Sequence, residues 1–275
     1  MEPRPRPSAI KPALLRVALR VGRITRHLPR VRAFYHLRDL YQKILPEGFL
    51  VRAQIEPGLV LDLDLTSNLG LFLWHYPDFY EKEEIAAFCS FVNPGSVVLD
   101  VGANAGLYTL LAAKRGAQVF AIEADPLNAA MLRHHIQLNG VSNQVTVFEM
   151  AATGAEKVVS LYRNPLNSGE SNITERGAPA GEIAGRTIDS LHLPPVDICK
   201  MDIEGAEFEA LTGMGQTLKR SPDLKLFVEY AEAFGNSAPL LDYLRANFAR
   251  LKVLEAPQMD AMKKIPPFCN VLAER

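Results

Sequence analysis

The 275-residue sequence predicts an α/β fold whose mostly parallel sheet is covered by helices on both faces. First, from Ser96 onward, short apolar runs alternate regularly with helical segments of about 10–15 residues. Second, these runs are apolar throughout, as strands buried on both faces of a sheet are. Third, two further apolar runs near the C-terminal end predict an antiparallel closing hairpin.

The first 95 residues predict helices and one hairpin. A helical segment runs to about Leu45. Alternating polar and apolar residues around the turn Glu56-Pro57-Gly58 predict a β-hairpin over 49–65, and a further helix covers 81–91. We expect residues 1–74 to form a basic arm, helix and hairpin, and residues 75–275 to form the main domain.

Seven strands are expected in the main domain, at 97–101, 119–122, 145–148, 196–201, 226–228, 250–254 and 270–273. The helices expected between them cover 107–115, 126–139 and 206–218. Asp125 is expected to cap the second of these helices, with proline at its first position. His134 and His135 on that helix are expected at the surface. A polar loop over 164–181 is expected between two short β-like runs.

Charge divides the chain into two unlike pieces. Residues 1–38 carry ten basic side chains and one acidic one, a net charge of +9, whereas the other 237 carry 20 basic and 30 acidic ones, net −10. Apolar residues at helical spacing within 14–28 suggest either a basic amphipathic helix on an anionic membrane or nucleic acid, or a solvated arm. No apolar run reaches the roughly 18 residues of a membrane span. Three widely separated cysteines indicate neither a disulfide framework nor a zinc site, so a cytoplasmic location is expected.

The strongest local signal is the turn from Asp100 to Gly106, placed between a strand and a helix. Its glycines, Gly102 and Gly106, lack the GxGxxG spacing of a dinucleotide site. Asp100 would repel phosphates, but it suits a ligand with an ammonium and a sulfonium, which indicates S-adenosylmethionine. Glu123, at the end of the next strand, can accept both hydroxyls of a ribose. Glu149 ends the third strand and is placed either to reach an adenine amino group or to lie exposed in solvent.

Several segments of residues 75–275 resemble the FkbM family of S-adenosylmethionine-dependent methyltransferases. They are the glycine turn, VFAIEADPLNAAMLRHHIQLNG, the run Thr187–Leu191, Phe79-Tyr80-Glu81 and, most specifically, the KxDxEGAE pattern that begins at Lys200. The resemblance implies a Rossmann-like, seven-stranded methyltransferase fold and O-methylation of a hydroxyl. Together with the residue patterns, it gives as cofactor-binding candidates Tyr80, Glu81, Asp100, Gly102, Asn104, Gly106, Glu123, Ala124, Glu149 and Asp202.

Three acids are expected to surround the transferred methyl group. Asp202 and Glu204 follow the fourth strand and Glu229 ends the fifth, so all three should converge on one crevice. We expect Asp202 to act as the base and the other two to position the acceptor. The same oxygens could instead hold a divalent cation such as Mg²⁺.

The sequence thus predicts an O-methyltransferase for a hydroxyl of a saccharide, glycolipid or secondary metabolite. The alternatives are an RNA or protein methyltransferase recruited by the basic arm, and a non-catalytic cofactor-binding module. The arm could also contact a membrane surface. Specific DNA binding is not expected, because the fourth strand lacks the Asn/Asp-Pro-Pro-Tyr motif of enzymes that methylate base amides.

Overall fold

The computed structural model describes residues 31–46, 48–77, 80–164, 167–234, 237–256, 261–262 and 265–275. The chain separates into two compact units. The first comprises residues 1–80 with 166–168, and the second comprises 81–165 with 169–275. The amphipathic segment within residues 14–28 lies outside the described residues, as does most of the +9 arm. Among the described residues, no helix is both long and apolar enough to cross a membrane.

The first unit contains helices around one antiparallel hairpin. Its elements are α2 (Val31–Ile44), β1 (Leu50–Glu56), β2 (Leu59–Asp64) and α3 (Asn68–His75). The predicted hairpin is confirmed, with Val51 opposite Leu63. Leucines at alternate positions of β2 are buried, so the residues between them lie on the face that is partly exposed to solvent. Helix α3 was not predicted; the Ser67 side chain caps it by accepting a hydrogen bond from the Gly70 N–H.

The second unit is built on a seven-stranded sheet of order β12-β13-β11-β10-β3-β4-β5, in which only β13 runs antiparallel to its neighbours. The strands are β3 (Val97–Val101), β4 (Gln118–Glu123), β5 (Val145–Glu149), β10 (Ile198–Met201), β11 (Lys225–Ala231), β12 (Arg250–Val253) and β13 (Phe268–Glu274). All seven predicted strands are present. This order and the reversed β13 are those of the Rossmann-like class I methyltransferase fold, so the predicted fold class is confirmed.

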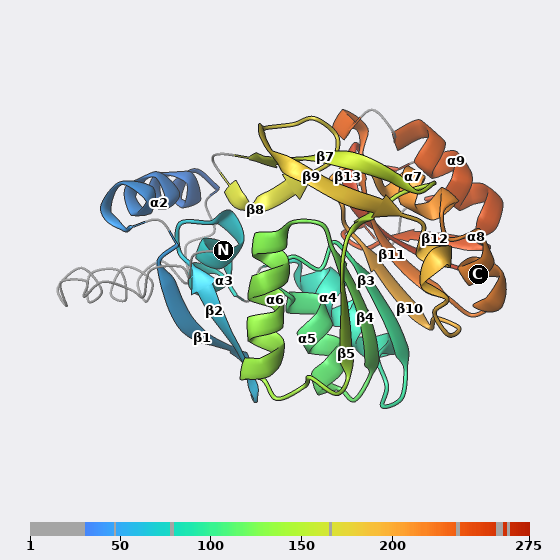
Figure 1. Ribbon diagram of the computed structural model, residues 1–275, viewed down its shortest axis with the longest axis horizontal. Helices are drawn as coiled ribbons and strands as arrows, with labels where there is room; N and C mark the ends of the chain where they lie inside the picture. The colour runs from blue at the N-terminus through green and yellow to red at the C-terminus, as the bar shows by residue number, and fades with distance from the viewer. Residues whose placement is uncertain are drawn as a thin grey trace. The chain divides into compact units, whose positions relative to one another are not determined.

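Helices cover both faces of this sheet (Figure 1). One face carries α4 (Lys82–Phe91), α5 (Leu107–Lys114) and α6 (Pro126–Leu138), and the other carries α7 (Glu207–Thr212), α8 (Gly215–Arg220) and α9 (Ser237–Asn247). The α7–α9 face contains a large apolar core, in which Leu99, Cys199 and Leu226 pack with Leu211 and Leu244. Burial of this apolar surface is the main driving force for folding.

The single helix predicted over 206–218 is wrong, because the chain turns between α7 and α8 at Gly213. A Cβ at this position would lie 2.2 Å from the Thr153 carbonyl oxygen, so only glycine allows the backbones to approach this closely. Glycine is therefore required where the turn between the two helices packs against the backbone of Thr153.

The polar loop predicted over 164–181 is also partly wrong. It contains β8 (Asn167–Asn172) and the start of β9 (Ala178–Arg186). With β6 (Ala151–Ala152) and β7 (Lys157–Asn164), they form a second sheet of order β6-β9-β7-β8.

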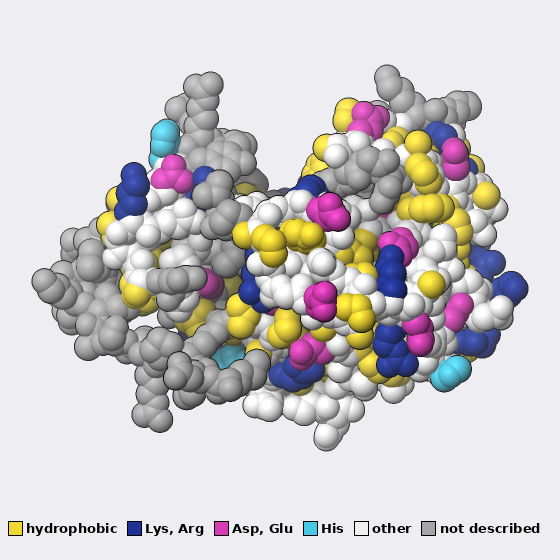
Figure 2. All heavy atoms as spheres, turned by 45° about the horizontal axis from the view of Figure 1, so that its top comes forward, with side chains coloured by type: hydrophobic (Ala, Val, Ile, Leu, Met, Phe, Trp, Pro, Cys, Tyr) yellow, Lys and Arg dark blue, Asp and Glu magenta, His cyan; other side chains and the backbone are white. Residues whose placement is uncertain are grey.

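Figure 2 shows one face of the molecule, on which several acidic side chains lie next to basic ones. Lys157 and Glu209 form one ion pair between exposed side chains of the second unit.

Candidate active site

The glycine turn between β3 and α5 is shaped by close backbone approaches. Gly102 has φ +85°, and a Cβ there would lie 1.9 Å from the Asp202 carbonyl oxygen. Gly106 has φ +98°, and its Cβ would lie 2.5 Å from the Leu132 side chain on α6. Asn104 takes the left-handed region as well, with φ +50°. The positive φ favours glycine at both positions, and the close backbone approach makes it sterically required at Gly102, which brings the turn directly against the segment that follows β10.

His135 supports this turn, which corrects the expected surface position of this residue. The side chain is buried, and its Nδ1 lies 2.7 Å from the Ala105 carbonyl oxygen. Because a carbonyl only accepts, this contact requires the proton on Nδ1. His134 beside it is exposed, as expected. Helical spacing did not reveal that His135 is buried, because its burial depends on the turn that packs against α6.

Asp100 lies under the turn and is 2% exposed. It accepts a hydrogen bond from the Thr109 hydroxyl on α5 at 2.5 Å. Burial raises the pKa of Asp100 to about 6, against the lowering effect of that hydrogen bond. The side chain therefore ties β3 to α5 in this structure, and its contact with a cofactor stays a prediction.

Glu123 ends β4 with both carboxylate oxygens oriented by the backbone. One accepts from the Asn104 N–H at 2.7 Å, the other from the Asp125 N–H at 2.8 Å. Burial outweighs these bonds and raises the pKa of Glu123 to about 7. A carboxylate has about four acceptor sites, so two remain for a pair of hydroxyls. The backbone thus fixes the orientation of the carboxylate, and its contact with a ribose stays a prediction.

Asp125 is the helix cap that the sequence predicts. It accepts from the Leu127 N–H at 2.8 Å, with Pro126 at the first helical position. It also pairs with the Arg163 guanidinium of β7 and accepts from the Ser171 hydroxyl of β8 at 2.6 Å. Burial would raise the pKa of Asp125, but these hydrogen bonds outweigh it and lower the pKa below its usual value. The second sheet is therefore fastened to the end of β4.

Glu149 and Ala124 lie at the same edge of the sheet. Glu149 stands beside Glu123 in the β4–β5 register and is exposed. Its carboxylate pairs with Arg133 of α6 at 2.8 Å. Ala124 is half-buried between the two strand ends. The adenine contact proposed for Glu149 stays a prediction.

The acids that follow β10 meet Glu229 of β11. Strand β11 continues past its predicted end to Ala231, so Glu229 lies within the strand. Burial, and after it the negative charges of Asp202 and Glu204, raise the pKa of Glu229 to about 9. In the sheet register Met201 stands opposite Val228, so Asp202 and Glu229 follow at neighbouring positions of the two strands, and the raised pKa favours the protonated form of Glu229 at neutral pH. The convergence of all three acids on an acceptor stays a prediction.

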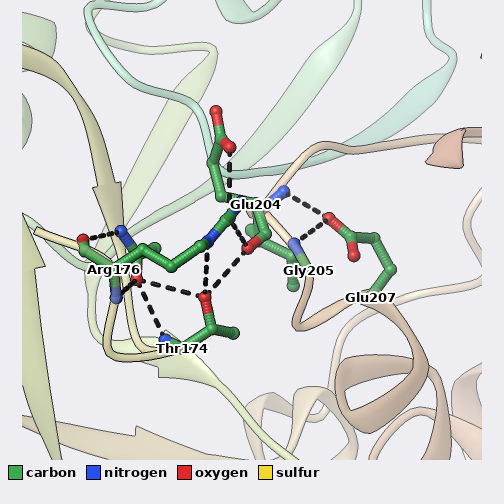
Figure 3. A network of polar contacts seen from close by, with 7 residues as sticks. Thr174, Arg176, Glu204, Gly205 and Glu207 are labelled. Carbon is green, nitrogen blue, oxygen red and sulfur yellow. Dashed lines mark hydrogen bonds and ion pairs between the residues drawn. The ribbon is translucent and has the colours of Figure 1, made fainter. Parts of the chain in front are cut away.

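The Glu204 segment is clamped by the turn between β8 and β9 (Figure 3). Thr174 and Arg176 both donate to the Glu204 carbonyl oxygen, and the Arg176 guanidinium lies 3.4 Å from the Glu204 carboxylate. Glu204 has φ +57°, a sparsely populated conformation for a side chain other than glycine. The side chain of Glu207, the first residue of α7, accepts from the Ile203 and Gly205 N–H groups and so orders the loop between β10 and α7.

Sequence reasoning missed a buried ion pair under Asp202. Lys200 on β10 is 2% exposed, and its Nζ lies 2.9 Å from Oε1 of Glu84 on α4 and 3.5 Å from Oδ2 of Asp202. Burial raises the pKa of Glu84 to about 7. Burial alone would lower the pKa of Lys200, but Glu84, Asp202 and Glu81 outweigh it and hold that pKa above its usual value. The available signal was a lysine inside an otherwise apolar strand.

Tyr80 and Glu81 belong to different compact units. Glu81 is the N-cap residue of α4, with φ +42°, and its carboxylate accepts from the Tyr108 hydroxyl at 2.7 Å. The Tyr80 ring lies edge-on to Phe72, with the ring centroids 5.6 Å apart. Their predicted cofactor contacts stay predictions.

The acids offer no evident metal site. Within the part of the chain that the structure describes, no group of three or more His, Cys, Asp or Glu side chains is arranged to hold a metal ion. The alternative of a divalent cation at Asp202 and Glu204 therefore has no structural support.

Two curated relatives illustrate the similarity to known methyltransferases. An arginine N(omega)-methyltransferase of Streptomyces achromogenes is 32% identical over 112 residues, covering 38% of this chain and 31% of that protein. A ribosomal protein L11 methyltransferase of Carboxydothermus hydrogenoformans is 33% identical over 97 residues, covering 35% and 28%. The chain spans about a third or less of the length of these relatives.

Two solved structures of other proteins superimpose on parts of this chain. Methyltransferase FkbM from Methylobacillus flagellatus superimposes with a TM-score of 0.45 at 19% identity, covering 74% of this chain and 54% of that one. A Streptococcus mutans protein solved in complex with SAH gives a TM-score of 0.44 at 12% identity, covering 70% and 96%. A family model described as the methyltransferase FkbM domain matches residues 100–251, which is more than half of the sequence. The chain belongs to the FkbM methyltransferase domain family.

Proposed function

We propose that the chain is an S-adenosylmethionine-dependent O-methyltransferase acting on a hydroxyl of a saccharide, glycolipid or secondary metabolite. The observation that carries the proposal is the gathering of Asp202, Glu204 and Glu229 next to the turn at Gly102. On one side of this region, the oriented carboxylate of Glu123 could accept hydrogen bonds from a diol. On the other side, the acids could attract a cation. This donor set fits a ligand that combines a ribose with a sulfonium.

The residues that would hold the cofactor lie at the ends of adjacent strands. Glu123 would accept the two ribose hydroxyls, Asp100 and the turn from Gly102 to Gly106 would face the amino acid end, and Glu149 would reach the adenine amino group. When bound, S-adenosylmethionine supplies an electrophilic methyl group. The protein must then align the acceptor oxygen with that group and remove its proton.

Asp202 would receive the proton of the acceptor hydroxyl. Its side chain is 32% exposed, whereas Lys200 beneath it is almost wholly buried, so Asp202 is the member of the pair that an acceptor can reach. Glu229, protonated at neutral pH, can donate a hydrogen bond to a second oxygen of the acceptor. Glu204, clamped by Arg176, would fix the wall of this region. A polyhydroxylated acceptor matches such a mixture of donors and acceptors.

A screen with methyl-labelled S-adenosylmethionine tests this function. The full chain is incubated with cell extract, and labelled products are identified by mass spectrometry. We expect label on the oxygen of a hydroxylated small molecule or glycolipid. Label on RNA or protein would contradict the acceptor class, and cofactor binding without any transfer would indicate a binding module.

Asp202→Asn is the matched control for that screen. The amide has the shape of the carboxylate but cannot take the proton, so turnover should fall by at least about 100-fold. The affinity for S-adenosylhomocysteine, whose sulfur is uncharged, should change by less than about threefold when measured by calorimetry. Unchanged turnover in the Asn variant would remove Asp202 from its assigned role.

A further inference from the structure

Lys200 lies at a position that otherwise favours an apolar side chain. In the sheet register it stands between Asp100 of β3 and Phe227 of β11, on the face covered by α4 and α5. Phe227 packs there edge-on to Phe88, with ring centroids 5.7 Å apart. The ammonium lies 5.0 Å from the centroid of the Tyr108 ring. A cation is therefore placed among aromatic rings in the interior of the second unit.

The partner of this cation is equally buried. Glu84, in the first turn of α4, is 1% exposed, and its Oε1 lies 2.9 Å from Lys200 Nζ. Removing two charges from water costs several kcal/mol per ion, and apolar residues of similar volume are often as stabilising. Stability alone therefore gives a weak reason for this pair.

The ammonium also reaches toward the candidate active site. Its distance to Asp202 Oδ2 is 3.5 Å, and Asp202 is far more exposed than either member of the pair. Glu84 on α4 thus contacts Lys200, and Lys200 in turn contacts Asp202, the partly exposed carboxylate that follows β10.

We infer that Lys200 is a positioning residue for Asp202, and that Glu84 acts on Asp202 only through Lys200, by balancing the charge of its ammonium. This inference rests on the proposed function, in which Asp202 lies beside the sulfonium. With Glu84 ionised, part of the ammonium's charge is offset, and Asp202 keeps its attraction for a cation. Without Glu84, the same ammonium cancels more of the charge of Asp202.

The other charged and titratable groups around Lys200 are mostly acidic. They come from the cap of α4, from β3, from α5 and from β11, and they are Glu81, Asp100, Tyr108 and Glu229. In the described residues around it, Lys200 is thus a cation set among carboxyl groups. A change in the charge that surrounds Lys200 should therefore alter the affinity for a cationic ligand.

The test compares two ligands that differ in charge at sulfur. The dissociation constants of S-adenosylmethionine and of S-adenosylhomocysteine, whose sulfur is uncharged, are measured by calorimetry at pH 7.5. Glu84→Gln, which keeps the shape of the side chain, should shift the preference toward S-adenosylhomocysteine by about three- to tenfold. The affinity for S-adenosylhomocysteine itself should hardly change, and it reports whether the pocket is intact.

The decisive measurement repeats Glu84→Gln in a Lys200→Met background. Because Glu84 is inferred to act through Lys200, the substitution should then change the ligand preference less than twofold. Lys200→Met alone should favour S-adenosylmethionine at least as strongly as the native chain does. An equal effect of Glu84→Gln in both backgrounds, or no effect in either, would overturn the inference.

Controls separate this outcome from a failure of the proposed function. Lys157→Met and Glu209→Gln remove the members of an exposed ion pair outside the site, and should leave the preference unchanged. A native chain that binds neither ligand would overturn the proposed function and the inference together. A native chain that binds both, with variants that leave their ratio unaltered, would overturn the inference alone.

Discussion

Asp125 shows how much one side chain can do at the edge of this sheet. It caps α6, pairs with Arg163 and accepts from Ser171, although it is 1% exposed. Burying a carboxylate is costly unless it is paired and hydrogen-bonded, and here every contact favours its charged form. One residue thus joins the end of β4 to both β7 and β8.

Two substitutions at Asp125 separate its capping from its pairing. Asparagine keeps an oxygen for the Leu127 N–H but loses the charge opposite Arg163, so unfolding free energy should fall by about 1–3 kcal/mol. Alanine loses the cap as well, and should cost about 1 kcal/mol more. Urea unfolding measures the unfolding free energy of both variants, and the dependence of that free energy on urea concentration should stay unchanged. Equal stabilities of the two variants would contradict the capping role.

At the scale of elements, the sequence was sufficient for every strand of the large sheet. Continuous apolar runs such as Val97–Val101 have one stable environment, a strand buried on both faces. The capped start of α6 was equally legible from Asp125 and Pro126, because capping is a local interaction.

Apart from α3, whose Ser67 cap is local, the features that were missed depend on partners distant in sequence. Strand β8 (Asn167–Asn172) has no apolar alternation, and its strand form comes from its place beside β7. The break at Gly213 depends on the backbone of Thr153, and the burial of His135 on the turn at Ala105. In the candidate site, the strand-end acids were predictable from parallel topology, whereas the Glu84–Lys200 pair was not. Its two members are brought together only by the packing of α4 on the sheet.

The turn after β3 gives a prediction at this scale. Gly102→Ala places a Cβ 1.9 Å from the Asp202 carbonyl oxygen at a positive φ, so it should cost more than about 2 kcal/mol of unfolding free energy. Gly140→Ala is the matched control, since φ is +67° there but nothing lies within 4 Å of the added Cβ. It should cost about 1 kcal/mol. Equal costs would show that backbone strain, and not the approach of the two loops, requires Gly102.

At the scale of the whole molecule, buried acids should make stability depend on pH. Burial raises the pKa of Asp100 to about 6, of Glu84 and Glu123 to about 7, and of Glu229 to about 9. Between their ordinary values near 4 and these values, the native state binds more protons than the unfolded state. The free energy of unfolding should therefore fall as pH rises from about 5 to 9.

Denaturant titrations at pH 5, 6, 7, 8 and 9 would measure that slope. Glu229→Gln removes the group with the highest of these pKa values, so the decline should become shallower over the whole range and should nearly vanish between pH 8 and 9. Below pH 7 a decline should remain, because Asp100, Glu84 and Glu123 still contribute to it. A native stability that rises steadily across the range would contradict the burial of these acids.

Charge also divides the molecule at this scale. The −10 part of the sequence includes the acids assigned to a cationic ligand, whereas the +9 part lies almost wholly outside the described residues. We propose that this arm concerns location at an anionic surface or delivery of the acceptor.

We propose that the acids at the carboxyl ends of the parallel strands form a site for S-adenosylmethionine. The most direct test of this site is calorimetric titration of the full chain with S-adenosylmethionine, alongside Glu123→Ala. We predict saturable binding at one site in the native chain, and an affinity at least about tenfold weaker in the variant, which lacks the oriented carboxylate. No binding to the native chain, or the same dissociation constant for both proteins, would contradict the proposed site.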